Sequence, residues 1–311
     1  MNHVPRSASL ALLLAVTLVV AACTTGGTPS APPSPTPTAP APASAPGTPS
    51  PSGSPSPGGF YLRAWLSQAI PPREAFARWP QLTIAGGRLI DGMVAIPAIY
   101  PGPLYVSFVA RTISDEGVAA VADELRSQGL LGGVTDFGTA GVPPGGPVAD
   151  LELIIDGTSR SLVGDPTRVV RCSTGTRCVP DPGTPEAFAA FWQRLGDTAG
   201  WLGGALGPQG PYEPERVAVL IVAPEPAQAG IEPGRATWPL AALFAGFGAP
   251  FPSGPGDRCA VVSGPDLALL LPAVQAANQL TRFVDAAGVK RSLVVRPLVP
   301  GEPDPCPAPG G

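Results

Sequence analysis

SDEGVAAVADELRSQG, residues 114–129, carries a complete set of helix signals. Ser114 is a favoured N-cap residue, and Gly129 is the residue type that most often ends a helix in the left-handed conformation. Between them, apolar side chains recur at helical spacing, at Val118, Val121, Ala122 and Leu125. The run therefore predicts a helix from about Asp115 to Gln128 that buries one face.

Strands are predicted on both sides of this helix. Val106–Val109 is a largely apolar run that precedes it. Leu151–Ile155 follows it and leads into Asp156-Gly157, a dipeptide typical of a two-residue hairpin turn. The order strand, helix, hairpin is that of a β-α-β-β unit.

The same order returns near the C-terminus. Cys259–Val262 is predicted as a strand, Ser263 caps a helix, and a hairpin follows with strands at Thr281–Asp285 and Ser292–Arg296. A shift of 149 residues (263 − 114) places Ser263 on Ser114. Either the chain holds two related β-α-β-β units, or the match is a coincidence of the kind that α+β chains show.

Three further elements complete the predicted α+β fold. A helix begins after Thr184, with Pro185 at its first position and an apolar face of Phe188, Phe191, Trp192 and Leu195. It lies between or beside the two units. Arg216–Val222 reads as a buried strand. The helix of the second unit contains Pro272, so it is either kinked or begins after Asp266.

Residues 60–311 form the predicted folded domain, either as one body or as two sub-units at about 60–180 and 181–311. Four cysteines lie in this region, and an even number in an exported chain predicts two disulfides. The more local of the three pairings joins Cys172 to Cys178 and Cys259 to Cys306. A zinc site made from all four is the alternative, but the spacing does not match zinc fingers or ribbons.

The N-terminus has the composition of an export signal. Arg6 supplies a positive charge, and Ala8–Ala22 is an uncharged apolar stretch that is shorter than the roughly 20 residues of a membrane span. The stretch ends in Val20-Ala21-Ala22-Cys23, which resembles the lipobox of bacterial lipoproteins. The resemblance implies that residues 1–22 are removed and that lipid on Cys23 anchors the chain at the extracytoplasmic face of the cell membrane. An ordinary signal peptide with an incidental cysteine is the alternative.

A proline-rich segment follows the cysteine. Residues 24–59 contain no residue types other than Pro, Ser, Thr, Ala and Gly, with 12 Pro in 36 positions. Such a composition cannot form a core and predicts an extended, disordered tether spanning residues 23–59. At about 3.1 Å per residue, it would reach on the order of 110 Å from the membrane. A proline-rich ligand for a partner protein is the alternative reading.

The composition excludes several classes of function. The single histidine, His3, lies in the predicted signal, so the mature chain has no histidine-assisted nucleophile and no histidine-ligated metal. The formal net charge is −4 and there is no basic block, which argues against nucleic-acid binding. No cofactor or metal motif occurs in the sequence. The remaining acid/base candidates are Glu213, Glu215 and Asp136.

Three short runs are similar to recurring pieces of uncharacterised Pro/Gly-rich lipoproteins of high-GC bacteria. These runs are Ile99–Pro103, Asp136–Gly138 and Val295–Glu302. The resemblance would cover most of residues 60–306. Because that family has no established activity, the resemblance implies an anchored envelope protein and assigns no catalytic residue.

The patterns together favour a non-enzymatic binding or envelope-interaction module. Its partner would be an envelope protein, peptide or polymer, and hairpin edges could accept a strand from such a partner. The candidate binding residues are the basic side chains of the last hairpin, Arg282, Lys290, Arg291 and Arg296. Two alternatives remain, a carboxylate-dependent hydrolase of cell-wall glycan and a two-lobed small-solute-binding lipoprotein.

Overall fold

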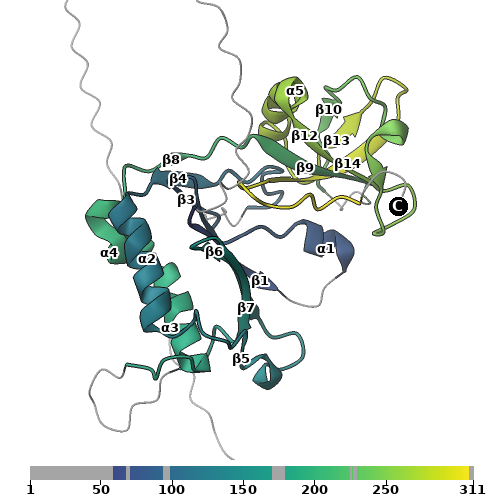
Figure 1. Cartoon of the computed structure of the whole chain (residues 1–311). Helices are drawn as coiled ribbons and strands as arrows, with labels where there is room; N and C mark the ends of the chain where they lie inside the picture. The colour runs from purple at the N-terminus through teal and green to yellow at the C-terminus, as the bar shows by residue number, and fades with distance from the viewer. Residues whose placement is uncertain are drawn as a thin grey trace, which may run out of the picture. The chain divides into compact units, whose positions relative to one another are not determined.

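Figure 1 shows the chain as a computed structural model, which describes residues 59–67, 71–93, 99–169, 179–224, 226 and 230–307. The predicted signal, Cys23 and the tether lie outside these residues, and so do Cys172 and Cys178 with the disulfide predicted between them. The described residues confirm the α+β class and are built on two β-sheets of eight and six strands.

The first sheet has the strand order β5-β7-β6-β1-β2-β3-β4-β8. Its neighbours are antiparallel except for β5 and β7, which run parallel. The strands are β1 (Tyr61–Ser67), β2 (Leu82–Ala85), β3 (Arg88–Asp91), β4 (Val109–Thr112), β5 (Asp136–Phe137), β6 (Val148–Ile155), β7 (Thr158–Gly164) and β8 (Gly210–Pro211).

The structure confirms a predicted turn of this sheet and corrects a predicted strand. The hairpin of β6 and β7 turns at Asp156-Gly157 as predicted, with both residues at positive φ (50° and 73°), a backbone region that the Asn/Asp-Gly pair adopts readily. The strand predicted at Val106–Val109 is wrong, because β4 begins only at Val109. Phe108 instead packs on the ring of Tyr212, and its carbonyl accepts the backbone N–H of that residue (2.9 Å).

The second sheet has the strand order β10-β13-β14-β9-β12-β11, with β10 and β13 parallel and the other pairs antiparallel. The strands are β9 (Arg216–Val222), β10 (Arg235–Thr237), β11 (Ala249–Pro250), β12 (Arg258–Ser263), β13 (Arg282–Val284) and β14 (Lys290–Pro297). The strands predicted from residues 216, 259, 281 and 292 are thus confirmed.

Helices α2 and α3 begin at the predicted caps. The Ser114 hydroxyl accepts the N–H of Gly117, and the Thr184 hydroxyl accepts the N–H of Ala187. Helix α5 starts at its predicted Ser263 boundary and runs through Pro272. The helices are α1 (Pro72–Phe76), α2 (Asp115–Ser127), α3 (Pro185–Leu195), α4 (Thr198–Leu202) and α5 (Gly264–Gln275), with 3-10 turns at Thr139–Gly141, Gly203–Ala205 and Phe244–Gly246.

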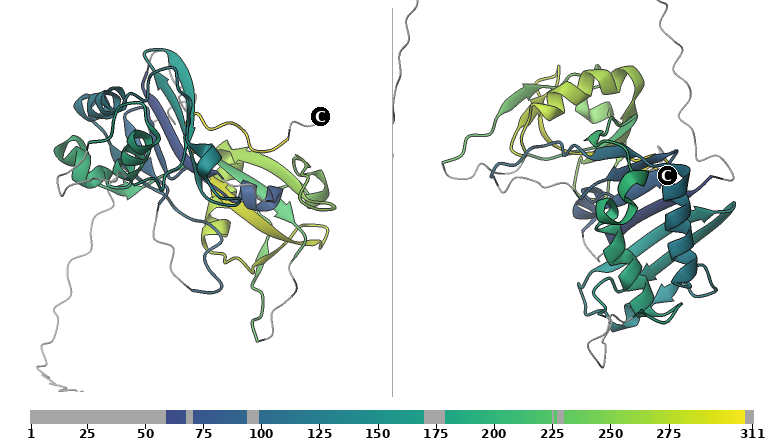
Figure 2. Two further views of the ribbon diagram at one scale, coloured as in Figure 1. Left: turned by 90° about the horizontal axis from the view of Figure 1, so that it is seen from below. Right: turned by 90° about the vertical axis from the view of Figure 1, so that its left-hand side faces the viewer.

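Helices α2, α3 and α4 cover one face of the first sheet (Figure 2). Leu62 and Ala64 of β1 pack there against Leu125 of α2 and Phe188 of α3. A Cβ on Gly164 of β7 would lie only 2.5 Å from the Phe188 ring, so glycine at this position lets α3 approach the sheet. The opposite face of β1 therefore remains for other contacts.

Helix α5 covers the second sheet in the same way, with Leu267, Leu270 and Val274 against the inner residues of β9 and β14. Beyond β14 the chain returns to the first sheet. Val299 packs with Ile90 and Phe108 in a small cluster, where the Tyr212 hydroxyl donates to the carbonyl of Leu298 (2.9 Å). This C-terminal segment, residues 298–306, thus contacts the face of the first sheet that the helices leave open.

The proposed duplication is not reproduced in the sheets. Strand, helix and hairpin do occur in the same order twice, but three strands separate β4 from the β6–β7 hairpin, whereas β9 alone separates β12 from β13–β14. Strand β4 runs parallel to the first strand of its hairpin, and β12 to the second. The chain passes from the first sheet to the second after Pro211. This is later than the predicted division near residue 180, because α3 and α4 still pack on the first sheet.

Candidate functional site

A cavity of about 270 Å³ opens to solvent on the face of β1 that points away from helices α2 and α3. Three segments form its walls: the second half of β1, the end of α1 with the turn after it, and the C-terminal segment. The lining residues are Arg63, Trp65, Leu66, Ser67, Ala75, Arg78, Trp79, Pro80, Arg296, Glu302, Pro303 and Pro305. We call this cavity the β1 pocket.

Strand β1 places Arg63 and Trp65 in the pocket by simple alternation. Leu62 and Ala64 point into the helix-covered core, so the residues between and after them point to the other side. Glu152 lies opposite Arg63 on β6, and its Oε2 accepts Nη2 of Arg63 at 2.5 Å. The guanidinium also lies 4.8 Å from the centre of the Trp65 ring, a cation–π contact. Arg63 is thereby fixed in one orientation at the pocket wall.

The opposite wall carries a second fixed arginine. Arg296 at the end of β14 forms an ion pair with Glu302 (Nη1 to Oε1, 2.5 Å), and its guanidinium lies 5.8 Å from the Phe76 ring centre. The second oxygen of Glu302 accepts the N–H of Val299 at 3.1 Å. Arg296 and Arg63 are each about 5% exposed, so both charges sit in a nearly dry environment.

Both arginines keep hydrogen-bond donors that no described residue uses. The Nε atoms of Arg63 and Arg296 are buried and have no acceptor. Among the described residues there is also no acceptor for Nη1 of Arg63 or Nη2 of Arg296. A buried donor without a partner costs about 1–3 kcal/mol, and such groups in folded proteins are usually satisfied by water or a ligand.

The other walls of the pocket are apolar and rigid. Trp79 donates its indole N–H to the carbonyl of Gly92 (2.9 Å), which fixes the ring. Nη1 of Arg78 donates to the carbonyl of Leu66 (3.1 Å) and joins the end of α1 to β1. Together with the prolines of the turn and of the C-terminal segment, the two tryptophans give the pocket flat apolar surfaces.

One carboxyl group beside the pocket is buried and has a raised pKa. Asp150 is the cross-strand partner of Trp65, and its Oδ2 is buried without a hydrogen-bond partner. Burial raises the pKa of Asp150, while the neighbouring Ser67 hydroxyl lowers it by a smaller amount. Burial also raises the pKa of Tyr61, at the start of β1, to about 12. The first sheet thus buries several polar groups on its open face.

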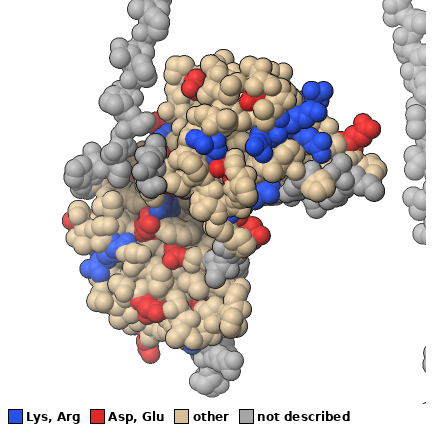
Figure 3. Space-filling view, turned by 90° about the vertical axis from the view of Figure 1, so that its right-hand side faces the viewer, with Lys and Arg blue, Asp and Glu red and all other residues tan. Residues whose placement is uncertain are grey.

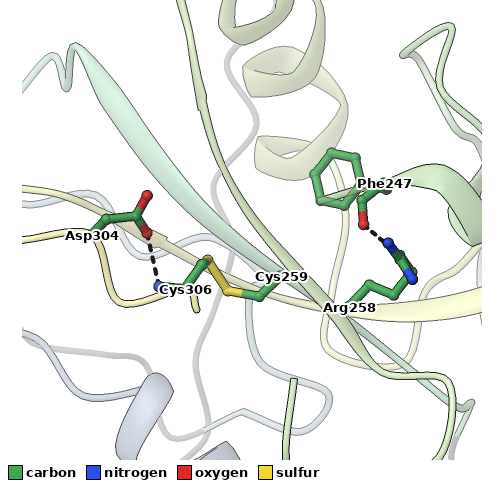
Figure 4. Close-up of a disulfide and its surroundings, with 5 residues drawn as sticks. All are labelled: Phe247, Arg258, Cys259, Asp304 and Cys306. Atoms are coloured by element: carbon green, nitrogen blue, oxygen red, sulfur yellow. Dashed lines mark hydrogen bonds between the residues drawn. A yellow bond between two sulfur atoms is a disulfide. The ribbon is translucent and has the colours of Figure 1, made fainter. Parts of the chain in front are cut away.

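A disulfide holds the C-terminal wall of the pocket. Cys306 is bonded to Cys259 on β12, with Cα atoms 5.3 Å apart, and this confirms one of the two predicted pairs (Figure 4). Asp304 accepts the backbone N–H of Cys306 at 2.8 Å. Residues 302–305 therefore lie between a buried ion pair and a covalent bond, which restricts this wall at both ends.

The four basic residues predicted as a binding face do not lie together. Arg282 is half-buried on β13, Lys290 is exposed at the start of β14, and Arg291, the next residue, points to the other face of the strand. Arg296 is buried in the ion pair described above. An exposed face cannot include it, because the returning C-terminal segment covers this end of β14.

One of these residues, Arg282, does lie beside another basic side chain on the second sheet. Parallel pairing of β10 and β13 puts Arg235 beside Arg282, and Figure 3 shows several Lys and Arg side chains close together on this side of the molecule. The predicted hairpin itself has no free edge along its paired residues, because β13 pairs with β10 and β14 pairs with β9. Strand addition at this hairpin is therefore not supported.

The predicted carboxylates do not converge on the pocket. Glu213 and Glu215 are exposed in the link between β8 and β9. Asp136 is exposed on β5, and hydrogen bonds from the backbone N–H and hydroxyl of Thr139 lower the pKa of its carboxyl. Over the described ranges, no cluster of three or more His, Cys, Asp or Glu residues could hold a metal ion.

The sequence patterns did not single out the β1 pocket. Alternation along Tyr61–Trp65 could have placed Arg63 beside Trp65, but their partners come from residues 152, 296 and 302. None of the helices in the described part of the chain is long and apolar enough to cross a membrane. The chain matches no known protein family, no curated protein and no solved structure.

Proposed function

We propose that the protein is a lipid-anchored, extracytoplasmic binding module that holds its ligand in the β1 pocket. The observation that carries this proposal is that two arginines, Arg63 and Arg296, line an open cavity and keep hydrogen-bond donors that no described residue accepts. The aromatic and proline walls around them give the cavity the mixed character of ligand sites, mostly apolar with a few placed polar groups.

Binding explains the carboxylates of the pocket better than catalysis does. Both oxygens of Glu302 already accept hydrogen bonds, one from Arg296 and one from the backbone of Val299. Glu152 is bound by Arg63. Hydrolysis of a glycoside needs one carboxyl that donates a proton and a second that is free to act as base or nucleophile. Neither glutamate is free in this way.

A carboxylate-dependent hydrolase of cell-wall glycan remains the second candidate, and Asp150 is the observation that favours it. Its pKa is raised by burial, as a general acid requires, and it lies across from Trp65. The distinguishing experiment incubates the full chain with purified cell-wall glycan and measures the release of reducing sugar. Release that disappears in Asp150→Asn would replace the binding proposal by the hydrolase.

Hydrogen–deuterium exchange tests the binding site itself. The full chain is mixed with purified fractions of the bacterial envelope, and we expect added protection in three segments, residues 63–67, 78–80 and 302–305. The same protection should be weakened in Trp65→Ala and unchanged in Arg126→Gln, whose side chain is 48% exposed on α2. Protection that falls elsewhere, or in no segment with any fraction, would contradict the pocket as the binding site.

The anchor has a separate test. Cys23→Ser removes the sulfur that the lipobox resemblance assigns to lipid, so the variant should leave the membrane fraction and appear in the soluble extracytoplasmic fraction. The wild-type chain should incorporate a labelled fatty acid, and the variant should not. Retention of Cys23→Ser in the membrane fraction would contradict lipid anchoring without bearing on the pocket.

A further inference from the structure

We infer that the ligand of the β1 pocket is a sugar ring that bears a carboxylate, presented as one unit of an acidic envelope polysaccharide. The inference rests on the proposed function and names the class of ligand. It draws on the charge balance of the lining residues, on the geometry of their donors, and on the shape and opening of the cavity.

The charge balance favours an anion. Three arginines line the pocket, Arg63, Arg78 and Arg296, against the single acid Glu302. Glu152 stands behind Arg63 and Asp150 lies across from Trp65, so these acids offset part of the positive charge of the lining residues. Burial raises the pKa of Asp150, which favours its neutral form relative to that of an exposed aspartate.

The donor geometry favours a planar oxyanion. A guanidinium presents its N–H groups in a fixed plane that matches the two oxygens of a carboxylate. Each pocket arginine donates one terminal nitrogen to a glutamate, and no described residue accepts the other, Nη1 in Arg63 and Nη2 in Arg296. Because both groups are also fixed by stacking on Trp65 and Phe76, their remaining donors are oriented before a ligand binds.

The apolar walls favour a ring. The indole N–H of Trp79 is occupied by the carbonyl of Gly92, so this side chain offers the pocket a fixed apolar surface. Trp65 is half-buried and contributes a second aromatic surface. The C–H face of a pyranose packs on such surfaces, and its hydroxyls and carboxylate at the ring edge remain free for the arginines and Ser67.

The size and opening of the pocket favour one unit of a chain. A volume of about 270 Å³ is just below the roughly 300–1,000 Å³ that is typical of small-molecule sites. The cavity is open to solvent on one side, which allows a polymer to continue beyond the bound ring. A phosphate-bearing sugar shares the oxyanion chemistry, so the experiment includes it as a separate arm.

Calorimetric titration of the full chain tests the inference with three probes: methyl β-D-glucuronide, methyl β-D-glucoside and glucose 1-phosphate. The glucoside has the same ring without the carboxylate. We expect saturable binding of the glucuronide, at least tenfold weaker binding of the glucoside and of the phosphate, and a loss of affinity for the glucuronide as salt concentration rises.

Variants connect the preference to the pocket. Arg63→Lys keeps the positive charge beside Glu152 but loses the planar fork, so it should reduce glucuronide affinity several-fold and leave glucoside affinity unchanged. Arg63→Gln combined with Glu152→Gln removes both members of the ion pair and should abolish the preference. Arg126→Gln is the matched control and should bind as the wild type does. Circular dichroism shows whether each variant is folded, and Arg63→Lys keeps the test decisive if the double variant is not.

The outcomes separate this inference from the proposed function. Equal affinity for glucuronide and glucoside that is lost in Trp65→Ala would overturn the carboxylate and leave the pocket as a binding site. Tighter binding of the phosphate would overturn the carboxylate in favour of a phosphorylated sugar. Absence of binding by all three probes overturns the ligand class. In that case exchange protection of the pocket by envelope fractions would keep the proposed function, and its absence would remove both.

Discussion

Arg296 and Glu302 form a buried ion pair that closes the turn by which the chain passes from the second sheet back to the first. Their side chains are 6% and 7% exposed. Arg216 of β9 also stabilises this turn, because its Nη2 donates to the backbone carbonyl of Glu302 at 2.7 Å. The pair therefore positions the C-terminal wall of the β1 pocket as well as one of its two fixed arginines.

Removal of one member of this pair should be strongly destabilising. Glu302→Gln leaves Arg296 charged and buried without its counter-ion, and an uncompensated buried charge of this kind costs about 3–5 kcal/mol. Urea denaturation measures the loss. The control is Arg126→Gln, whose ion pair with Asp123 is exposed and should contribute less than about 0.5 kcal/mol. A Glu302→Gln variant as stable as this control would contradict the role of the pair.

The disulfide should stabilise the fold and order the pocket wall. It closes a loop of 47 residues, and loop entropy gives roughly 4 kcal/mol as its upper contribution. The double variant Cys259→Ser, Cys306→Ser should unfold at lower urea concentration and exchange amide hydrogens faster at residues 302–306. Unchanged exchange in this segment would mean that the ion pair alone positions the wall.

Asp150 should make the stability of the wild-type chain fall as pH rises. Its pKa is raised in the folded protein, so the native state binds the proton more tightly than the unfolded chain does. This contribution is present in full below the unfolded pKa of about 4 and is lost as pH rises through the folded pKa. Asp150→Asn lacks the penalty and should be more stable than wild type at pH 7, with no difference near pH 3. Denaturation curves at the two pH values check the sign, and a benefit that is larger at pH 3 would refute it.

The hydroxyl of Tyr212 should contribute a smaller, pH-independent amount. It joins the β8–β9 link to Leu298 through one neutral hydrogen bond in a buried position. Tyr212→Phe leaves a buried carbonyl without its donor, which costs about 1–3 kcal/mol. Thermal denaturation should show a loss below that of Glu302→Gln. A loss equal to or larger than that one would mean that this contact, and not the ion pair, dominates the connection between the sheets.

Local signals predicted the starts of two helices and one hairpin turn. Capping residues at positions 114 and 184 fixed where α2 and α3 begin, and Asp156-Gly157 fixed the turn between β6 and β7. These features depend on neighbours a few residues away, so all of the interacting residues lie within one short stretch of sequence. The strand before α2 was predicted three residues too early, and nothing near Phe108 in the sequence indicates its contact with Tyr212, about a hundred residues later.

The pocket could not be predicted in the same way. The identity of Arg296 as a basic residue on a hairpin made it a candidate for an exposed face, and nothing local distinguishes it from Lys290. Its burial depends on Glu302 and on a C-terminal segment that the disulfide ties to β12. The role of Arg63 likewise depends on Glu152, which β-sheet register alone brings opposite to it.

The sequence by itself predicted the α+β class, the starts of α2 and α3, the β6–β7 hairpin turn and the strands β9, β12, β13 and β14, because propensities, caps and turns act over short distances. It also favoured the Cys259–Cys306 pair that the structure contains. It also supplies the lipobox resemblance at Cys23 and the proline-rich segment after it. The tertiary structure decided the order of strands in the two sheets and the site that they form. Arg63 and Arg296 are 233 residues apart (296 − 63), and they share a cavity because the chain's last segment returns to the open face of its first strand.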